Sequence, residues 1–332
     1  MIKRDEYIDF LRFLGLTMII LVHVQPDFTI TQLRCFDVPL MVFVSGLTAS
    51  NKIIGSYSDY FKRRTKRLVL PVWIFLGFYL TTLYLAQFYI LQEQYLTGRM
   101  IIRSFLLLDE SIGYVWIIRV FLLVMLVTPI LQFLANKTIG VYSIIITLTI
   151  WVGVIEVVHY CSSYLIPYPI LHDIYINIIQ YTCAYSLLFY LGLKVRYLDY
   201  KKLRAVLLFV VLCSIILLGV YYANHGFPLK LTPTYKEPPH SYYLVYGVLV
   251  SLLLWYFKPF KKINNSFFVT IGQNTIWIYL WHMPFVLAST LFDVHWSVKF
   301  IFVYSLSVAI FLVQKKVVNS IDNSFLNKYF LG

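Results

Sequence analysis

Charged side chains are scarce in this chain of 332 residues. Only 13% of the residues are Asp, Glu, Lys or Arg, whereas 60% are hydrophobic. The mean hydropathy of +0.75 is higher than a soluble domain of this size needs, and apolar runs of about twenty residues recur along the chain. This composition excludes a soluble protein, so we expect a polytopic membrane protein.

Several motifs of enzyme chemistry are also missing. The four cysteines, Cys35, Cys161, Cys183 and Cys213, show no paired spacing for a metal or redox centre. The chain contains no glycine-rich phosphate loop and no HExxH zinc motif. We therefore expect no metal. Internal repeats and soluble domains are absent too, so residues 1–332 are predicted to form one membrane domain.

Acidic residues are few, 15 against 28 Lys and Arg, which gives a net charge of +13. Twenty of the basic residues fall on one side of the predicted membrane spans and five fall in the opposite loops. This asymmetry follows the positive-inside rule, so it indicates topology rather than nucleic-acid binding and places both termini in the cytoplasm. The predicted fold is an all-α bundle of about ten spans, at residues 8–24, 36–54, 68–91, 114–135, 141–160, 174–193, 203–223, 241–257, 268–290 and 297–317.

The most informative residues are Arg12 and His23, which lie in the apolar segment YIDFLRFLGLTMIILVHV at 7–24. A charge in a membrane helix costs about 2.5–3.5 kcal/mol on insertion scales, so such residues usually serve a function. Eleven residues turn a helix about 20° beyond three full turns, so both side chains share one face, roughly 16–17 Å apart. We expect two positions along one buried path, on a first helix that is retained rather than cleaved.

The second predicted span opens with FDVPLMVFVSGLTAS at 36–50. Asp37 should lie at its outer end, at the level of His23, where it is either an interfacial residue or a carboxylate that orients the His23 ring. Ser45 and Gly46 are small residues of the kind that let membrane helices pack closely.

The first cytoplasmic loop is expected to end in YFKRRTKRLVLPVW, which leads into the third span and holds a dense basic cluster, Lys62, Arg63, Arg64, Lys66 and Arg67. One interpretation is an anchor that contacts anionic lipid headgroups. The other is a binding site for a phosphate-bearing cytoplasmic ligand, because arginine binds phosphate through two parallel hydrogen bonds. The cluster alone does not decide between them.

Four further candidates lie on the fourth and fifth spans. Trp116 is either an interfacial anchor or part of the site, and Arg119 lies deep enough to act within the bundle. Glu156 and His159 share a helix face and form a second acid/base candidate if they are buried.

The outer loop at 224–240, NHGFPLKLTPTYKEPPH, holds four prolines and is either a lid over a substrate mouth or a connector. The ninth span contains IGQNTIWIYLWHMPF, in which Asn274 is expected to cap the helix. His282 ranks below His23, because a lone histidine at such a position is more often structural.

Together these strings resemble the acyltransferase-3 family of integral membrane acyltransferases. Arg12 and His23 match its R-x10-H signature, VPLMVFVSG is similar to its PLFFFxSG segment, and RRTKRLVLPVW resembles its basic helix-entry motif. GQNTIWIYLWHMP resembles its late G-x-N-S/T…IYLxHxP helix. The chain departs from the family at Met41 and Val42, where phenylalanines are common, and at Asp37, where many relatives have histidine.

The resemblance implies O-acyl transfer, usually of acetyl from acetyl-CoA, to a hydroxyl of a cell-surface polysaccharide or lipid-linked sugar at the bacterial cytoplasmic membrane. His23 is then expected to act as general base, with Asp37 near it, and Arg12 is counted with them among the catalytic residues. Arg63, Arg64 and Arg67 are expected to bind the coenzyme, with Arg12 deeper along the same path. Trp116, Arg119 and Asn274 are candidates to stabilise the oxyanion.

Two other classes of function fit parts of the sequence. A transporter or glycan exporter would also place Arg12 and His23 in the membrane, as lining of a path. The absence of an inverted repeat and of paired, interrupted helices weakens that interpretation. The other class, a purely structural subunit of a glycan-synthesis complex, has little support, because a structural role does not require charged residues inside the membrane.

Overall fold

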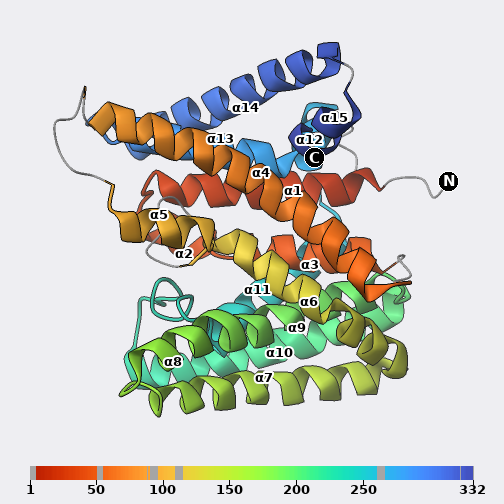
Figure 1. Cartoon of the computed structure of the whole chain (residues 1–332). Helices are drawn as coiled ribbons and strands as arrows, with labels where there is room; N and C mark the ends of the chain where they lie inside the picture. Colours follow the sequence, from red (N-terminus) through yellow and green to blue (C-terminus); the bar gives the residue numbers. More distant parts are fainter. Residues whose placement is uncertain are drawn as a thin grey trace.

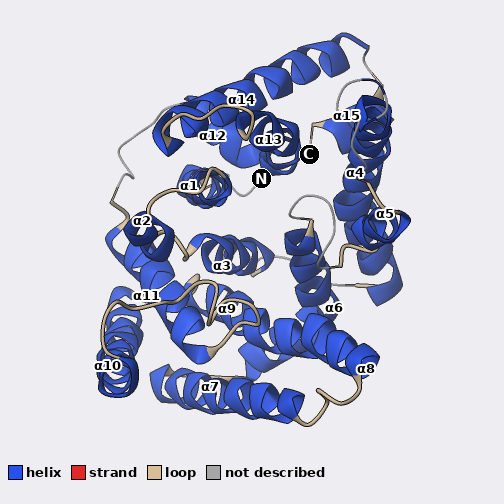
Figure 2. Cartoon of the chain, turned by 90° about the vertical axis from the view of Figure 1, so that its left-hand side faces the viewer, coloured by secondary structure: helices blue, strands red, loops and turns tan. Residues whose placement is uncertain are grey.

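The computed structural model describes residues 5–50, 55–87, 89, 96–108, 115–259, 266–321 and 323–331. Within these ranges every regular element is a helix, as the sequence predicts, and no strand occurs. The long helices run side by side in one bundle (Figures 1 and 2). In chain order the elements are α1 (Glu6–His23), α2 (Phe28–Leu33), α3 (Asp37–Ala49), α4 (Tyr57–Ala86), α5 (Gly98–Phe105), α6 (Trp116–Lys137), α7 (Val141–Ser163), α8 (Pro169–Ile174), the π-helical η2 (Tyr175–Gln180), α9 (Tyr181–Val195), α10 (Tyr200–His225), α11 (Ser241–Phe257), α12 (Ser266–Gln273), α13 (Thr275–Ser289), α14 (Trp296–Ile321) and α15 (Ser324–Phe330).

Seven helical segments of the described chain are long and apolar enough to cross a membrane, namely 28–49, 57–86, 116–137, 141–163, 169–195, 200–225 and 296–321. The remaining predicted spans coincide with α1, which carries Glu6, Asp9 and Arg12, with the shorter α11, and with α12 and α13. Ten spans therefore stay a prediction. Positions 51–54, 88, 90, 91 and 114 of the predicted spans lie outside the described residues.

Helix α4 begins earlier than the sequence analysis places it. Ser56 caps the helix by accepting a hydrogen bond from the Asp59 backbone N–H at 3.4 Å, and the helix then continues for 30 residues. The basic residues Lys62 to Arg67 were expected in a loop, but they lie on the first turns of α4. The helix thus carries these mostly exposed positive charges on its first turns, before its buried part begins at Val69.

Helix α1 runs through the middle of the bundle, between α12–α13 and α3, while α7, α10 and α14 lie at the periphery (Figure 2). Below it, α3 packs very closely on α9. A Cβ at Gly46 would lie 2.2 Å from the carbonyl oxygen of Phe189, and a Cβ at Gly192 would lie 2.2 Å from that of Phe43. Only glycine fits at either position, in agreement with the packing role predicted for Gly46.

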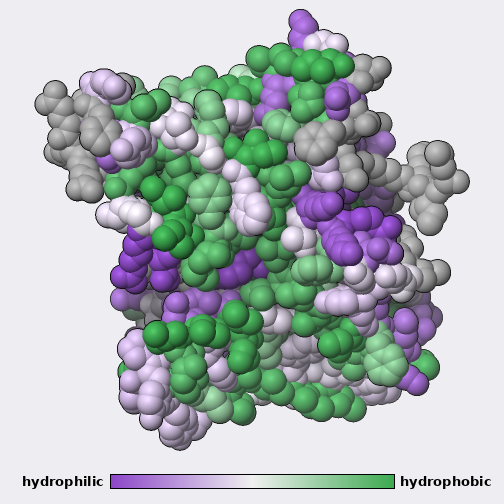
Figure 3. Space-filling model, viewed as in Figure 1, coloured by the Kyte–Doolittle hydropathy of each residue, from purple (hydrophilic) through white to green (hydrophobic). Residues whose placement is uncertain are grey.

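The two ends of the bundle carry different elements. The first turn of α1, the start of α4 and α15 share one end, whereas α2, α5, α8 and the last turn of α1 lie at the other (Figure 1). A largely hydrophobic face separates hydrophilic areas at the two ends (Figure 3). The chain thus begins and ends on one side of the bundle. That this side is cytoplasmic stays a prediction.

Candidate active site

Two adjacent cavities follow one face of α1. The Arg12 cavity has a volume of about 170 Å³ and is lined by Arg12, Leu16, Ile19, Met41, Ser45, Leu68, Ile117, Ile118, Phe121, Thr275, Ile276 and Tyr279. The His23 cavity has a volume of about 260 Å³ and is lined by Ile19, Val22, His23, Gln25, Thr31, Arg34, Asp37, Val38, Trp116, Ile117, Thr232, Pro233, Lys236, Glu237 and Tyr279. Ile19, Ile117 and Tyr279 line both, so the two cavities adjoin at these side chains.

His23 lies against a second histidine. Its Nδ1 is 2.8 Å from Nε2 of His282, and the two rings are stacked with centroids 4.9 Å apart. His282 comes from α13 and is fully buried, and its own Nδ1 is hydrogen-bonded to the carbonyl oxygen of Tyr279. The residue that the sequence analysis ranked second is therefore the hydrogen-bond partner of the first.

These contacts define which nitrogen of each ring carries a proton. A backbone carbonyl only accepts, so Nδ1 of His282 donates to Tyr279, and Nε2 of a neutral His282 is then an acceptor. Nδ1 of His23 must donate to that acceptor. The lone pair of neutral His23 is consequently on Nε2, and this is the form in which an imidazole accepts a proton from a substrate.

Asp37 lines the same cavity, but its hydrogen bonds go elsewhere. One carboxylate oxygen is bonded to Nη1 of Arg34, and the other accepts from the Val38 backbone N–H at 2.8 Å. Both members of the Arg34–Asp37 pair are buried. The geometry thus favours His282 rather than Asp37 as the residue that orients the His23 ring.

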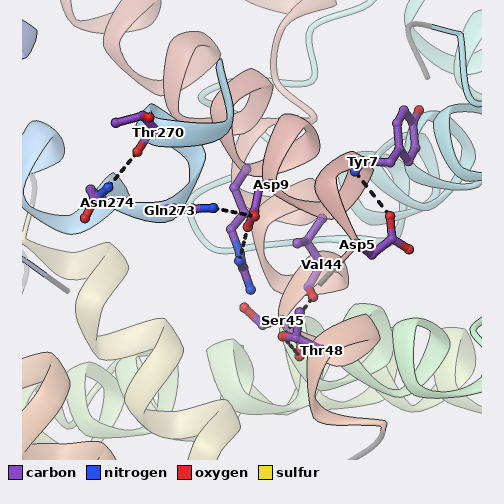
Figure 4. Close-up of polar contacts among 10 residues, drawn as sticks. Asp5, Tyr7, Asp9, Val44, Ser45, Thr48, Thr270, Gln273 and Asn274 are labelled. Carbon is purple, nitrogen blue, oxygen red and sulfur yellow. Dashed lines mark hydrogen bonds and ion pairs between the residues drawn. The ribbon is translucent and has the colours of Figure 1, made fainter. Parts of the chain in front are cut away.

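Arg12 is held on its own helix by Asp9, one turn earlier. Nη1 of Arg12 lies 2.8 Å from Oδ1 of Asp9, and Gln273 donates to the other oxygen of Asp9 at 3.3 Å (Figure 4). The approach of α12 to α1 depends on Gly272, because a Cβ there would lie 1.9 Å from the Asp9 carbonyl oxygen. Asn274 precedes α13 as predicted, but its side chain donates to Thr270 O at 2.7 Å and makes no capping bond to α13.

The basic turns of α4 lead to the Arg12 cavity. Arg63 and Arg67 are exposed, Arg64 is half-buried over the Tyr60 ring, and Leu68 lines the cavity itself. The basic turns are therefore followed on the same helix by a residue of the cavity lining.

The outer loop is a wall of the His23 cavity, since Thr232, Pro233 and Lys236 line it. Gln32 of α2 fixes this wall through two hydrogen bonds to the backbone of Thr232, at 2.9 and 3.0 Å. The Nζ atom of Lys236 lies 5.4 Å from the centre of the Trp116 ring, which faces the same cavity.

The remaining candidates are not among the residues that line either cavity. Arg119 donates to Leu107 O at 3.1 Å and lies over the Tyr181 ring. Glu156 is exposed and accepts from the Ser241 backbone N–H at 3.0 Å at the start of α11.

His159 lies 3.0 Å from the amide nitrogen of Gln180, and its ring centre is 3.7 Å from that of His240. Burial and the neighbouring His159 lower the pKa of His240, whereas Glu156 acts in the opposite direction. None of Glu156, His159 and His240 lines the His23 cavity.

Arg34 and Lys236 line the His23 cavity and were not identified as site residues from the sequence. Both are buried. The sequence does contain a feature that sets them apart. They are two of only five basic residues predicted in the loops on the side of the membrane that carries little positive charge.

A family model described as an acyltransferase domain matches residues 5–313 of the chain. The match includes every lining residue of both cavities. No curated protein and no solved structure shows significant similarity to the chain.

Proposed function

The chain belongs to the acyltransferase-3 family of membrane acyltransferases, and we propose that it transfers an acetyl group from cytoplasmic acetyl-CoA to a hydroxyl of a cell-surface polysaccharide or lipid-linked sugar. The observation that carries this proposal is the pair of adjacent cavities along α1. One cavity adjoins a basic helix end, and the other is lined by His23, whose ring is hydrogen-bonded from behind by the buried His282. We place the protein in the bacterial cytoplasmic membrane, with the basic end on the cytoplasmic side.

The donor binds from the basic end in this proposal. Coenzyme A carries several phosphate charges, and Arg63, Arg64 and Arg67 supply guanidinium groups that suit phosphate. Its pantetheine arm is narrow and unbranched, which suits the Arg12 cavity with its mainly apolar lining beyond Leu68. Since α1 rises about 1.5 Å per residue, the arm has roughly 16–17 Å to cover between the levels of Arg12 and His23.

The transfer itself uses His23 as general base. Nε2 of His23 takes the proton of the acceptor hydroxyl while the hydroxyl oxygen attacks the thioester carbonyl carbon. The tetrahedral intermediate then collapses, the carbon–sulfur bond breaks, and the proton on His23 passes to the departing thiolate. The products are an O-acetyl ester and coenzyme A thiol, and the hydrogen bond to His282 holds the ring in the required tautomer throughout.

The developing oxyanion needs a hydrogen-bond donor. Of the three candidates predicted from the sequence, Trp116 lines the His23 cavity, whereas Arg119 and Asn274 donate to backbone carbonyls elsewhere. We therefore assign this role to the indole N–H of Trp116.

The proposal is tested with the purified protein and radiolabelled acetyl-CoA. The acceptor is the surface glycan of cells that lack the protein, and mass spectrometry of glycan from cells with and without it identifies the modified unit. We expect labelled esters on the glycan and an acetyl mass increment only in cells that hold the protein. A protein that neither transfers acetyl nor hydrolyses acetyl-CoA would contradict the proposal and favour a transport role.

A further inference from the structure

We propose that Arg34 and Lys236 form an anion-binding site in the His23 cavity, and that the acceptor is a sugar unit bearing a carboxylate or phosphate group. The inference rests on the proposed function, because it assigns the acceptor to the cavity of the general base. It deepens that function by naming the chemical class of the acceptor.

The first observation is an unused donor on Arg34. This side chain is only 3% exposed, and its Nη1 is bonded to Asp37. Its Nε atom is buried without a hydrogen-bond partner among the residues that the structure describes. A buried N–H without a partner costs free energy, and native proteins usually satisfy such groups. Arg34 lines the cavity, and a ligand oxygen bound against its guanidinium would give this N–H a partner.

The second observation is a buried ammonium with only a distant counter-ion. Lys236 is 6% exposed, and its Nζ lies 3.9 Å from Oε1 of Glu237. That distance is beyond the hydrogen-bond range, and Glu237 itself is half exposed to solvent. Lysines are almost never fully buried unless they are paired, so this ammonium favours an anion in the cavity.

The net charge of the buried groups in the cavity also favours an anionic ligand. Its buried charged groups are Arg34, Asp37 and Lys236, which together leave one positive charge. Glu237 is exposed and therefore largely screened by water. One resident negative charge on the acceptor would neutralise the excess, and its oxygens would reach donors from two different elements.

The surroundings of the two cations suit a carbohydrate. The Trp116 ring faces the cavity beneath Lys236, and Thr31 and Thr232 supply hydroxyl groups. The hydrogen bonds between Gln32 and Thr232 fix the wall that carries Lys236 before any ligand binds. Such preorganisation lowers the cost of ordering the site, so the acceptor's charge is held in a defined position relative to His23.

The same two cations would also suit a different role, the stabilisation of the tetrahedral oxyanion. The two roles differ in what they recognise. An oxyanion forms with every acceptor, whereas a resident anion is present only on charged acceptors. The preference between charged and neutral acceptors therefore separates them.

The test uses surface glycan from cells that lack the protein, offered to the purified protein with radiolabelled acetyl-CoA. One portion is untreated, one has its carboxylates reduced to alcohols, and one has its phosphates removed with cold hydrofluoric acid. Wild type is compared with Lys236→Met, with Lys236→Arg, and with Lys230→Met as the matched control. Lys230 is an exposed lysine of the same loop that does not line the cavity.

We expect one of the two treatments to lower transfer by wild type and by Lys230→Met at least tenfold, and the treatment that does so identifies the anion. Lys236→Met should transfer to treated and untreated glycan at rates within about threefold, and Lys236→Arg should retain the preference. Equal loss on all glycans in Lys236→Met, or no effect of either treatment on wild type, would overturn the inference and leave the proposed function intact. No transfer by wild type to any glycan would contradict the proposed function, and the inference with it.

Discussion

The two cavities along α1 differ in how their polar groups are held. In the Arg12 cavity the charge is compensated locally, because Asp9 lies one helical turn before Arg12. In the His23 cavity the polar groups come from α1, the α2–α3 junction, α6, α13 and the outer loop, and they meet only in the folded chain. The Arg12 cavity therefore has a mainly apolar lining with one locally compensated charge. The His23 cavity instead brings together polar groups from distant parts of the chain, as a reaction centre does.

The largest expected effect tests the reaction centre. His23→Ala removes the base, and a positioned base typically contributes about 10²–10⁴-fold in rate. We expect acetyl transfer to fall by that factor while the amount of protein in the membrane is unchanged, as measured by labelled transfer and immunoblotting. Transfer at the wild-type rate by a well-expressed variant would remove His23 from the mechanism.

Substitution of Arg12 tests whether the other cavity serves the donor. Arg12→Gln is expected to raise KM for acetyl-CoA roughly tenfold, as expected for a lost hydrogen bond from a charged group, with a smaller change in kcat. The double variant Asp9→Asn with Arg12→Gln also neutralises the buried carboxylate that Arg12 faces. If the double variant regains the wild-type KM, Arg12 acts only through the packing of α1.

A smaller effect is expected at His282, which orients His23 without touching the substrate. His282→Leu removes the acceptor of the hydrogen bond from His23, and the loss of a neutral hydrogen bond corresponds to about 2–10-fold in rate. His282→Gln restores an acceptor oxygen and should recover part of kcat with KM unchanged. Equal rates for the Leu and Gln variants would show that His282 has a packing role alone.

The comparison of the two cavities also explains what the sequence could predict. The helical class, the shared face of Arg12 and His23 and the close packing at Gly46 follow from residue type and helical period, which are local properties. The basic cluster was visible for the same reason. The expectation that it lies in a loop was wrong, because α4 already begins after the cap at Ser56, which gives only a weak signal in the sequence.

The non-local features were not predictable in this way. His282 lies 259 residues after His23 in the sequence, and no spacing rule connects them. The Arg34–Asp37 pair is local by contrast, at three residues apart, and it gives the carboxylate expected beside His23 another partner. The position of Lys236 depends on the loop wall that Gln32 fixes through Thr232, and these two residues are 200 residues apart in the sequence. Tertiary contacts of this kind decide the chemistry of the site.

The central claim is that donor and acceptor enter from opposite ends of α1, and membrane vesicles of defined orientation test it directly. Radiolabelled acetyl-CoA is supplied either to the face that exposes the basic end of α4 or to the other face, and a membrane-impermeant esterase then reports where the new esters lie. The account predicts transfer only from the basic face, with esters accessible on the opposite one. Esters formed equally from either face, or on the face that received the donor, would contradict it.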